Sequence, residues 1–310
     1  MKNKKILVVL GGTSGERKVS LDSGKACIKA LKKIGYKKIS TFDPKKKSYS
    51  SIDKDKIDII FNALHGKNGE DGVAQTYFEC LRIPYTHSGV LSSYKAMNKI
   101  ISKEIFKKNK ILSPRYLVFT KNNFKKTRLL KLIKKKKISF PIVVKPVNEG
   151  SSLGVNICKN ISILTKASKS LFKKYSELIY EPFIAGQEIQ AAVINGVSIG
   201  AIELKPKRKF YDYKAKYSKA AKTKHIMPAN LTKRQYKEVL KIAKKAHNVI
   251  GCKGVTRSDF KLFKNKFYLL EINTQPGMTS LSLVPEIAYY KGISFENLVE
   301  KILLSASINK

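Results

Sequence analysis

The most specific chemical pattern lies in residues 255–273, which read as a strand hairpin. Asp259 lies in its first half, and Glu271 and Asn273 lie in its second half. Side chains two residues apart on a strand share a face, so Glu271 and Asn273 point the same way. With a turn near Asn265, Asp259 lies opposite Glu271, and three oxygen ligands suited to Mg²⁺ or Mn²⁺ converge. The alternative is a solvated polar face, because most intervening positions are apolar.

A second pattern is FPIVVKPVNEGSSLGV at residues 140–155, where Lys145 ends an apolar strand and a glycine–serine loop follows. Backbone N–H groups in such loops can bind phosphate, and Lys145 would add positive charge. The spacing matches neither a Walker A motif nor a dinucleotide fingerprint. An ordinary turn is the alternative.

A third pattern is LGGTSGERKVS at residues 10–20, a glycine-rich turn after the first predicted strand. Such turns often place a ligand at the N-terminus of the next helix. Glu16 would repel a phosphate there and would favour an ammonium group. The alternative is an exposed Glu at a helix start, which the helix dipole also favours.

Three further stretches carry candidate residues. His65, in NALHGKNGEDG (62–72), is either a ligand contact or a turn histidine. Lys216 and Tyr217 end KFYDYKAKY (209–217), an aromatic–basic stretch suited to stacking nucleobases or to a lid over a phosphate site. In NTQPGMTSLSLVP (273–285), Gly277 lies in a turn and Ser282 is placed to N-cap a helix.

The elements that position these residues divide the chain in two. Apolar runs at 5–10 and 57–64 predict buried parallel strands, with helices over 19–34 and 72–81, so the first 95 residues predict an α/β domain. The remainder mixes strands and helices as in α+β folds. It begins with a basic helix over 95–107. A strand at 116–119, a Lys-rich helix and a strand at 141–146 are expected next. Further strands are expected near 155 and at 178–183, 188–194 and 197–204. A helix over 232–250, the hairpin and two short helices complete the chain.

The composition suggests a class of binding partner that differs from the one the motifs suggest. The chain has 310 residues, 63 Lys+Arg against 22 Asp+Glu, and a net charge of +41. A hydrophobic fraction of 43% excludes disorder of the whole chain. The charge alone suggests a nucleic-acid or anionic-membrane binder. However, only seven of the basic residues are Arg, and no recognisable nucleic-acid-binding module is visible.

Cysteine spacing and the N-terminus indicate a soluble cytoplasmic protein. Cys27, Cys80, Cys158 and Cys252 are far apart and form no CxxC pair, which argues against a zinc site or a disulfide framework. The apolar stretch at 6–10 is too short for the core of a signal peptide, and no run approaches the roughly 18 apolar residues of a membrane span.

Six segments together resemble the D-alanine–D-alanine ligase family of the ATP-grasp superfamily over nearly the whole chain. They are LGGTSGERKVSLDSG, ALHGKNGEDGVAQ, IPYTHSGVLSSYKAMNK, VKPVNEGSSLGV, FYDYKAKY and EINTQPGMTSLSLVPEIA, in the family's order and spacing. The resemblance implies an α/β plus α+β, ATP-grasp architecture. An N-terminal parallel α/β substrate domain (1–95) would be followed by a central (96–182) and a C-terminal (183–310) subdomain that clasp ATP between them.

The implied activity is ATP-dependent ligation of two D-alanines through an acyl phosphate, an early step of peptidoglycan synthesis. The resemblance also implies two Mg²⁺ or Mn²⁺ ions and a homodimer, without a nucleic-acid or membrane partner. Two alternatives stay open: an ATP-grasp ligase for another carboxylate–amine pair, and a basic nucleic-acid-binding protein.

The resemblance also implies a role for each site residue. Metal ligands would be Asp259, Glu271 and Asn273. ATP would be bound by Lys99, Lys145, Ser151, Ser152, Glu181, Glu188 and Lys216, with Glu181 at the adenine and Glu188 at the ribose. Substrate would be bound by Glu16, His65, Ser282 and Leu283, with Glu16 at the ammonium of the first D-alanine. Catalysis would use Lys216 at the transferred phosphoryl group, Arg257 and the Gly277 N–H at the oxyanion, and a loop-closing trio of Glu16, Ser151 and Tyr217.

Three positions depart from the family's pattern, and one is Ser258, in the RSD of the hairpin, where an apolar residue is commoner. Pro182 stands where many members have Lys, which removes a side chain from the adenine segment and keeps a backbone contact. Asn98 replaces a common Asp before Lys99.

Overall fold

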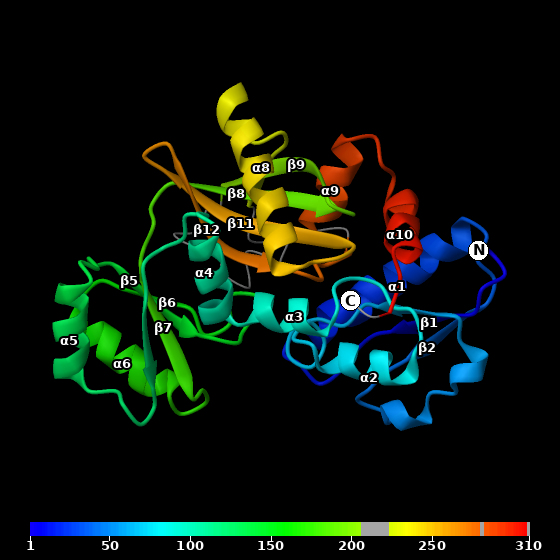
Figure 1. Cartoon of the computed structure of the whole chain (residues 1–310), viewed down its shortest axis with the longest axis horizontal. Helices are drawn as coiled ribbons and strands as arrows, with labels where there is room; N and C mark the ends of the chain where they lie inside the picture. Colours follow the sequence, from blue (N-terminus) through cyan, green and yellow to red (C-terminus); the bar gives the residue numbers. More distant parts are fainter. Residues whose placement is uncertain (206–222, 280–281, 309–310) are drawn as a thin grey trace.

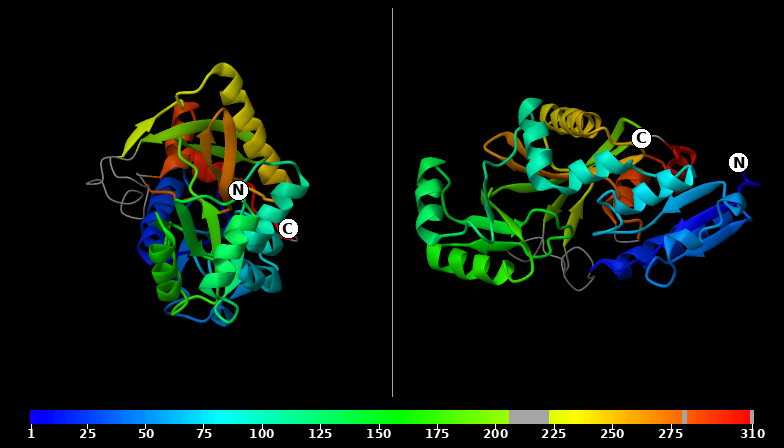
Figure 2. Two further views of the ribbon diagram at one scale, coloured as in Figure 1. Left: turned by 90° about the vertical axis from the view of Figure 1, so that its left-hand side faces the viewer. Right: turned by 60° about the horizontal axis from the view of Figure 1, so that its bottom comes forward.

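The structure is a computed structural model that describes residues 1–205, 223–279 and 282–308 (Figure 1). Three sheets account for its strands. In Figure 1 and in the right-hand view of Figure 2 the N-terminal sheet and the sheet of residues 117–182 lie at opposite ends, and the third sheet lies between them. No helix within the described residues combines the length and apolar character that a bilayer crossing requires.

The N-terminal sheet is parallel, as predicted. Its order is β2 (Ile39–Phe42), β1 (Ile6–Val9) and β3 (Ile59–Asn62). Every residue of β1 and β3 is buried. The accompanying helices are α1 (Arg17–Lys33), α2 (Val73–Leu81) and the short 3₁₀ turns η1 (Tyr49–Ser51) and η2 (Lys54–Lys56). The sequence did not predict β2, whose two central residues are polar and exposed.

The second sheet is antiparallel and has the order β4 (Leu117–Thr120), β7 (Glu177–Pro182), β5 (Ile142–Pro146) and β6 (Asn156–Cys158). One hydrophobic cluster joins this sheet to α5 (Lys126–Lys135) and α6 (Ile161–Leu171). Of these elements, α6 was not predicted. It begins where the Asn160 side chain accepts a hydrogen bond from the N–H of Ile163.

The third sheet is antiparallel, with strands β8 (Gln187–Ile194), β9 (Val197–Lys205), β10 (Lys224–Ile226), β11 (Val255–Phe263) and β12 (Lys266–Asn273) in the order β10-β9-β8-β11-β12. Helix α8 (Lys233–Ile250), which starts at a capping box on Thr232, packs on one face. Helices α9 (Leu283–Tyr290) and α10 (Phe295–Leu304) share a cluster with the other face. The predicted strand pair, helix, hairpin and terminal helices are thus confirmed.

The predicted basic helix over 95–107 is wrong as a single element. It is divided into α3 (Val90–Met97) and α4 (Lys99–Lys108), because Asn98 has an extended backbone and its side chain caps α4 through the N–H groups of Ile100 and Ile101. Asn98 is therefore the N-cap of α4, a position at which Asn and Asp are about equally favourable. Phe106 of α4 joins the core between α8 and the third sheet.

Hydrophobic cores cross the predicted domain limits. Ile6 and Leu31 of the N-terminal part share one cluster with Val299 and Ile302 of α10, and Figure 1 shows α10 beside α1. The three sheets nevertheless occupy separate stretches of chain, 6–62, 117–182 and 187–273. The limits at residues 95 and 182 stay predictions.

Candidate active site

The β11–β12 hairpin has the predicted register, with Asp259 paired directly with Glu271. The turn lies at Lys264 and Asn265, and both have positive φ, as a tight two-residue hairpin requires. The register shifts after Asp259, which leaves Leu270 as an extra residue on β12. Arg257 pairs with Asn273, so two cross-strand pairs bring the four polar residues into one region.

The donor atoms of this region suit a small hard cation. Arg257 binds Asp259 through two hydrogen bonds, Nε to Oδ1 at 2.8 Å and Nη2 to Oδ2 at 3.0 Å. Asn273 Oδ1 accepts the N–H of Gln275 at 2.7 Å, which fixes the amide. The described residues hold no cluster of three or more His, Cys, Asp or Glu side chains that could bind a metal. Two carboxylates and one amide fit Mg²⁺, which usually takes few protein ligands and completes its shell with water and substrate phosphates.

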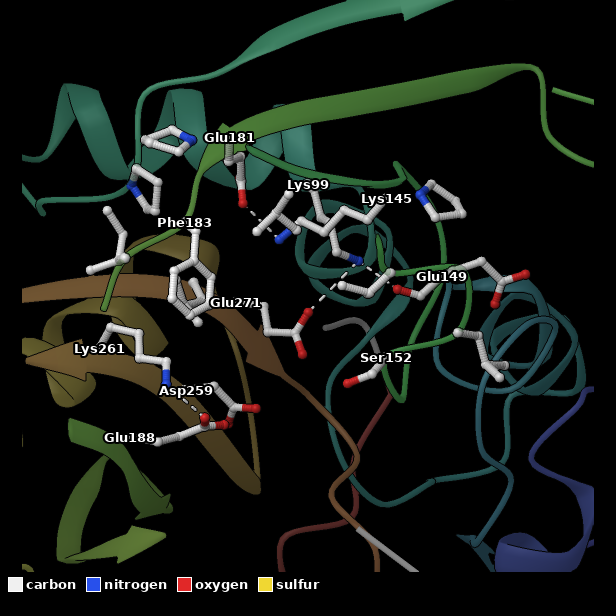
Figure 3. Close-up of a pocket in the computed structure, with 18 residues that line it drawn as sticks. Lys99, Lys145, Glu149, Ser152, Glu181, Phe183, Glu188, Asp259, Lys261 and Glu271 are labelled. Carbon is white, nitrogen blue, oxygen red and sulfur yellow. Dashed lines mark hydrogen bonds and ion pairs between the residues drawn. The ribbon is translucent and has the colours of Figure 1, made fainter. Parts of the chain in front are cut away.

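A first cavity of about 800 Å³ opens beside the hairpin (Figure 3). Val143, Phe183, Ile184 and Leu270 give it an apolar part. Its polar lining comprises Lys99, Lys145, Glu149, Ser152, Glu181, Glu188, Asp259, Lys261 and Glu271. A slot with an apolar wall and clustered cations at one side can hold a flat base and a polyphosphate.

Three buried charges form the wall of the first cavity. Glu181 forms two ion pairs: its Oε1 lies 2.7 Å from Lys103 Nζ, and its Oε2 lies 2.9 Å from Lys145 Nζ. Burial would raise the pKa of Glu181, but the two ammonium groups outweigh it and lower that pKa. Burial lowers the pKa of Lys103, while for Lys145 the carboxylates of Glu181 and Glu271 outweigh burial and raise it. The three groups carry a net positive charge that a phosphate would balance.

Lys99 is the first residue of α4 and lies between the metal-ligand candidates and the glycine–serine loop. Its Nζ donates to the Glu149 carbonyl at 2.5 Å and lies 3.7 Å from Glu271 Oε2. Burial is the largest influence on Lys99 and lowers its pKa. Because Lys99 and the α4 N-terminus are close together, their positive charges favour an anion here.

Lys261 and Glu188 face each other across β11 and β8 and form an ion pair of 2.9 Å at the cavity wall. Figure 3 shows this pair below Phe183 and beside Asp259. Pro182 also lines the cavity, while the N–H of Phe183 is donated to the Pro141 carbonyl.

A second cavity of about 510 Å³ adjoins the first, since both are lined by Lys99, Glu149 and Glu271. It also contains Glu16, Glu70, Ser151, Arg257 and Asn273. Glu16 is 4% exposed. The Ser151 hydroxyl donates a hydrogen bond to Glu16 Oε2.

Two glycines allow the backbone to pass close to the Glu16 carboxylate. A Cβ on Gly150 would lie 2.9 Å from Glu16 Oε1, and one on Gly66 would lie 3.1 Å from it. Gly66 also has φ +69°, a conformation that glycine tolerates best. A larger residue at either position would displace the carboxylate.

His65 does not line the second cavity but contacts Glu70, which does. Its Nδ1 is 3.3 Å from Glu70 Oε1, and its Nε2 is 3.1 Å from Ser23 Oγ. Ser23 Oγ also accepts the N–H of Met278 at 3.1 Å. His65 is therefore connected, through Ser23, to the 273–285 segment that carries Gly277.

At Gly277 the backbone passes close to the side chain of Ser282. A Cβ on Gly277 would lie 2.8 Å from Ser282 Oγ. Ser282 holds the predicted N-cap position of α9, but its side chain makes no capping hydrogen bond, and its Oγ accepts the N–H of Thr279 at 2.9 Å instead. Leu283 is the first residue of α9 and is buried in the core. Lys216 and Tyr217 lie outside the described residues.

Comparisons with known proteins agree with this geometry. A family model described as D-ala D-ala ligase N-terminus matches residues 36–88, and one described as D-ala D-ala ligase C-terminus matches residues 105–304. A D-alanine–D-alanine ligase of Pelagibacter ubique is 57% identical over 309 residues, with 99% of each chain covered. The chain belongs to the D-alanine–D-alanine ligase family.

Solved structures of the D-alanine–D-alanine ligase family have the same ATP-grasp fold. The crystal structure of the Bacillus anthracis D-alanine–D-alanine ligase complexed with ATP has a TM-score of 0.82 at 32% identity, covering 98% of this chain and 96% of that one. The VanG D-Ala:D-Ser ligase of Enterococcus faecalis also has a TM-score of 0.82, at 27% identity, covering 97% of this chain and 98% of that one.

The sequence did not single out several residues that belong to the two cavities of this D-alanine–D-alanine ligase family member. Lys103, Glu149 and Lys261 belong to the first cavity or its wall, and Glu70 lines the second. Lys103 lies four residues after Lys99, on the same helix face, which was the available signal. Gln190 pairs across the strands with Asp259, and its buried amide has no hydrogen-bond partner among the described residues.

Proposed function

We propose that this chain joins two D-alanines to D-alanyl-D-alanine with hydrolysis of ATP to ADP and phosphate. The observation that carries the proposal is the contact between the two cavities. A buried carboxylate, Glu16, lies in the second cavity, and the cations Lys99 and Lys145 lie in the first. An amino acid bound by its ammonium group at Glu16 would direct its carboxylate toward a phosphate in the first cavity.

In the first step, a carboxylate oxygen of the first D-alanine attacks the γ-phosphorus of ATP. The bond to the β–γ bridging oxygen breaks, and an acyl phosphate and ADP form. Lys99 and Lys145 stabilise the phosphoryl oxygens by charge, and the apolar wall with Phe183 holds the base. Glu181 and Lys103 fix Lys145 in place.

In the second step, the amine of the second D-alanine attacks the acyl carbon, loses a proton, and expels phosphate. We assign the oxyanion to Arg257 and the Gly277 N–H, and the second carboxylate to Ser282 and the Leu283 N–H. Arg257 lines the second cavity, and its guanidinium is held by Asp259. Water must be excluded because an acyl phosphate hydrolyses readily. The Glu16–Ser151 hydrogen bond joins two loops that line the cavity. We assign Tyr217 to the closure of these loops and Lys216 to the transferred phosphoryl group.

Asp259, Glu271 and Asn273 are the proposed ligands of two Mg²⁺ or Mn²⁺ ions. When bound, such ions neutralise phosphate charge and align the phosphates. The protein contributes an oxygen-rich site held in register by the hairpin. Ser152 would contact the phosphates from the glycine–serine loop, and Glu181 and Glu188 would lie at the adenine and ribose ends of ATP. We further propose a cytoplasmic homodimer and assign no nucleic-acid partner.

The test is release of phosphate with ATP, Mg²⁺ and D-alanine, with identification of the dipeptide by mass. Glu271→Gln is the control that should abolish release. Because one similar structure is a D-Ala:D-Ser ligase, a second arm offers D-serine or D-lactate as acceptor beside D-alanine. A mixed product rich in D-Ala-D-Ser would favour that second specificity. Absence of phosphate release with D-alanine would overturn the proposal.

A further inference from the structure

A third depression adjoins the first cavity and is lined by residues of α4, of the 110–116 connection and of the end of α5. It has a volume of about 1640 Å³. Seven of its thirteen lining residues are cations: Lys103, Lys107, Lys110, Arg115, Lys135, Lys136 and Lys137. About half of this lining is therefore cationic, which is also the share of Lys and Arg among the exposed residues of the described chain, so the distinguishing feature is that these cations line a concave surface. We call this depression the outer cavity.

Three separate segments bring these charges together: the end of α4, the connection 110–116, and the end of α5. The floor is apolar and includes Ile111 and Pro114, both buried. The outer cavity contains one acid, Glu104, and Glu104 Oε1 accepts the Tyr116 hydroxyl at 2.5 Å. A concave wall of cations on an apolar floor is a shape that a compact anion can fill.

Helix ends explain only some of these charges. Lys107 and Lys135 belong to the last turns of α4 and α5, where cations interact favourably with the helix dipole. Lys110, Arg115 and Lys137 lie outside the helices. Like charges within one concave site repel over distances shorter than the Debye length of about 8 Å at physiological ionic strength. An anion with several negative charges would relieve that repulsion.

The outer cavity and the first cavity share one wall. Pro114 lines both. Lys103 lines the outer cavity, is 1% exposed, and makes the 2.7 Å ion pair with Glu181 of the first cavity. An anion in the outer cavity would thus act on Lys103 and, through Glu181, on Lys145.

We propose that the outer cavity binds a small polyphosphate anion, at a site distinct from that of ATP. Lysines bind phosphate oxygens as point charges without a fixed angle, which suits a flexible chain of phosphates. The concave shape favours a compact anion over a rigid duplex. Because Lys103 connects the two cavities, we expect occupancy of the outer cavity to alter the affinity for ATP, and ATP then alters the affinity for the anion by the same factor.

The experiment uses the full chain saturated with Mg²⁺ and a non-hydrolysable ATP analogue, so that the phosphate contacts of the first cavity are filled. Tripolyphosphate is titrated by calorimetry at constant ionic strength. One triple variant is Lys107→Gln/Arg115→Gln/Lys136→Gln. The matched control is Lys241→Gln/Lys244→Gln/Lys245→Gln, which removes three exposed charges from α8.

We expect one tripolyphosphate per chain, a Kd raised at least tenfold in the outer-cavity variant, and a change below twofold in the control. Equal loss in both variants would show that net charge alone binds the anion and would overturn the proposal. So would the disappearance of binding when the ATP analogue is present, which would assign the anion to the first cavity. Stronger binding of a short DNA duplex than of tripolyphosphate, lost in the same variant, would also overturn it.

Discussion

The Ser151 hydroxyl donates a hydrogen bond to Glu16 Oε2 and thereby joins two loops that are 135 residues apart in the chain. One loop follows the first strand of the N-terminal sheet, and the other follows β5 of the second sheet. Ser151 has φ +49°, so the loop holds it in a conformation that few non-glycine residues adopt. The bond therefore connects two sheets across the second cavity.

Ser151→Ala should lower kcat/KM for D-alanine roughly ten- to a hundredfold, because a hydrogen bond to a charged group contributes about 1.5–3 kcal/mol. The loss should appear at saturating ATP, since Glu16 is assigned to the amino acid. Steady-state kinetics with varied D-alanine measure it. Ser162→Ala, on the exposed surface of α6, is the control. Unchanged kcat/KM in Ser151→Ala would mean that the bond does not serve the substrate site.

Lys103→Met should destabilise the protein and weaken ATP binding. It leaves Glu181, which is 2% exposed, with Lys145 as its one partner among the ion pairs described. Removing one partner of a buried ion pair costs about 3–5 kcal/mol of unfolding free energy. The KM for ATP should rise more than kcat falls, because Lys145 is drawn toward Glu181 and away from phosphate. Urea unfolding and ATP kinetics measure the two effects.

The double variant Lys103→Met/Glu181→Gln distinguishes charge from packing. It also removes the buried carboxylate that has lost one of its two cationic partners, so stability should recover over Lys103→Met while ATP binding stays weak. Lys108→Met, on the exposed side of α4, is the matched control. If the double variant were no more stable than Lys103→Met, the buried charge of Glu181 would not be the cause of the lost stability.

Asp259→Asn and Glu271→Gln should each weaken Mn²⁺ binding by at least roughly tenfold in the presence of ADP, since each removes a carboxylate from a site with two. The spin-resonance signal of free Mn²⁺ measures this independently of turnover. Glu300→Gln is the control, because it removes one carboxylate that pairs with Lys2 on the surface. A Kd equal to that of the control in both variants would place the metal elsewhere.

The register of the hairpin was accessible from the sequence because the information is local. Alternation along β12 and a turn at Lys264 and Asn265 suffice to place Asp259 opposite Glu271. The same holds for β1 and β3, whose continuous apolar runs reflect burial on both faces.

The buried ion pairs in the wall of the first cavity could not be predicted from the local sequence. Lys103 and Glu181 are 78 residues apart, and nothing local distinguishes Lys103 from the many other lysines until the fold buries it. The resemblance placed Glu181 near ATP, but its pairing with two lysines depends on how α4 packs against β5 and β7. The break at Asn98 was missed because helix-forming residues flank it on both sides.

His247 gives the last prediction, which concerns pH. It lies in α8, is 3% exposed, and its Nδ1 is 2.9 Å from Thr256 Oγ1. Burial, with a smaller contribution from Lys253, lowers the pKa of His247 from 6.5 to about 4. Between these values the unfolded chain binds the proton more readily than the folded one. The stabilisation is therefore present above pH 6.5 and is lost as the pH falls toward 4.

From pH 7 to pH 5, this single group should lower the unfolding free energy by about 2 kcal/mol. His247→Gln, which can still hydrogen-bond Thr256 but does not titrate, should lose that part of the pH dependence. Urea titrations of both proteins at the two pH values measure the difference. His225→Gln, at a partly exposed position on β10, is the control and should keep the drop. If His247→Gln showed the same drop as the native chain, the pH dependence would arise from other groups, and the buried neutral imidazole would not be its source.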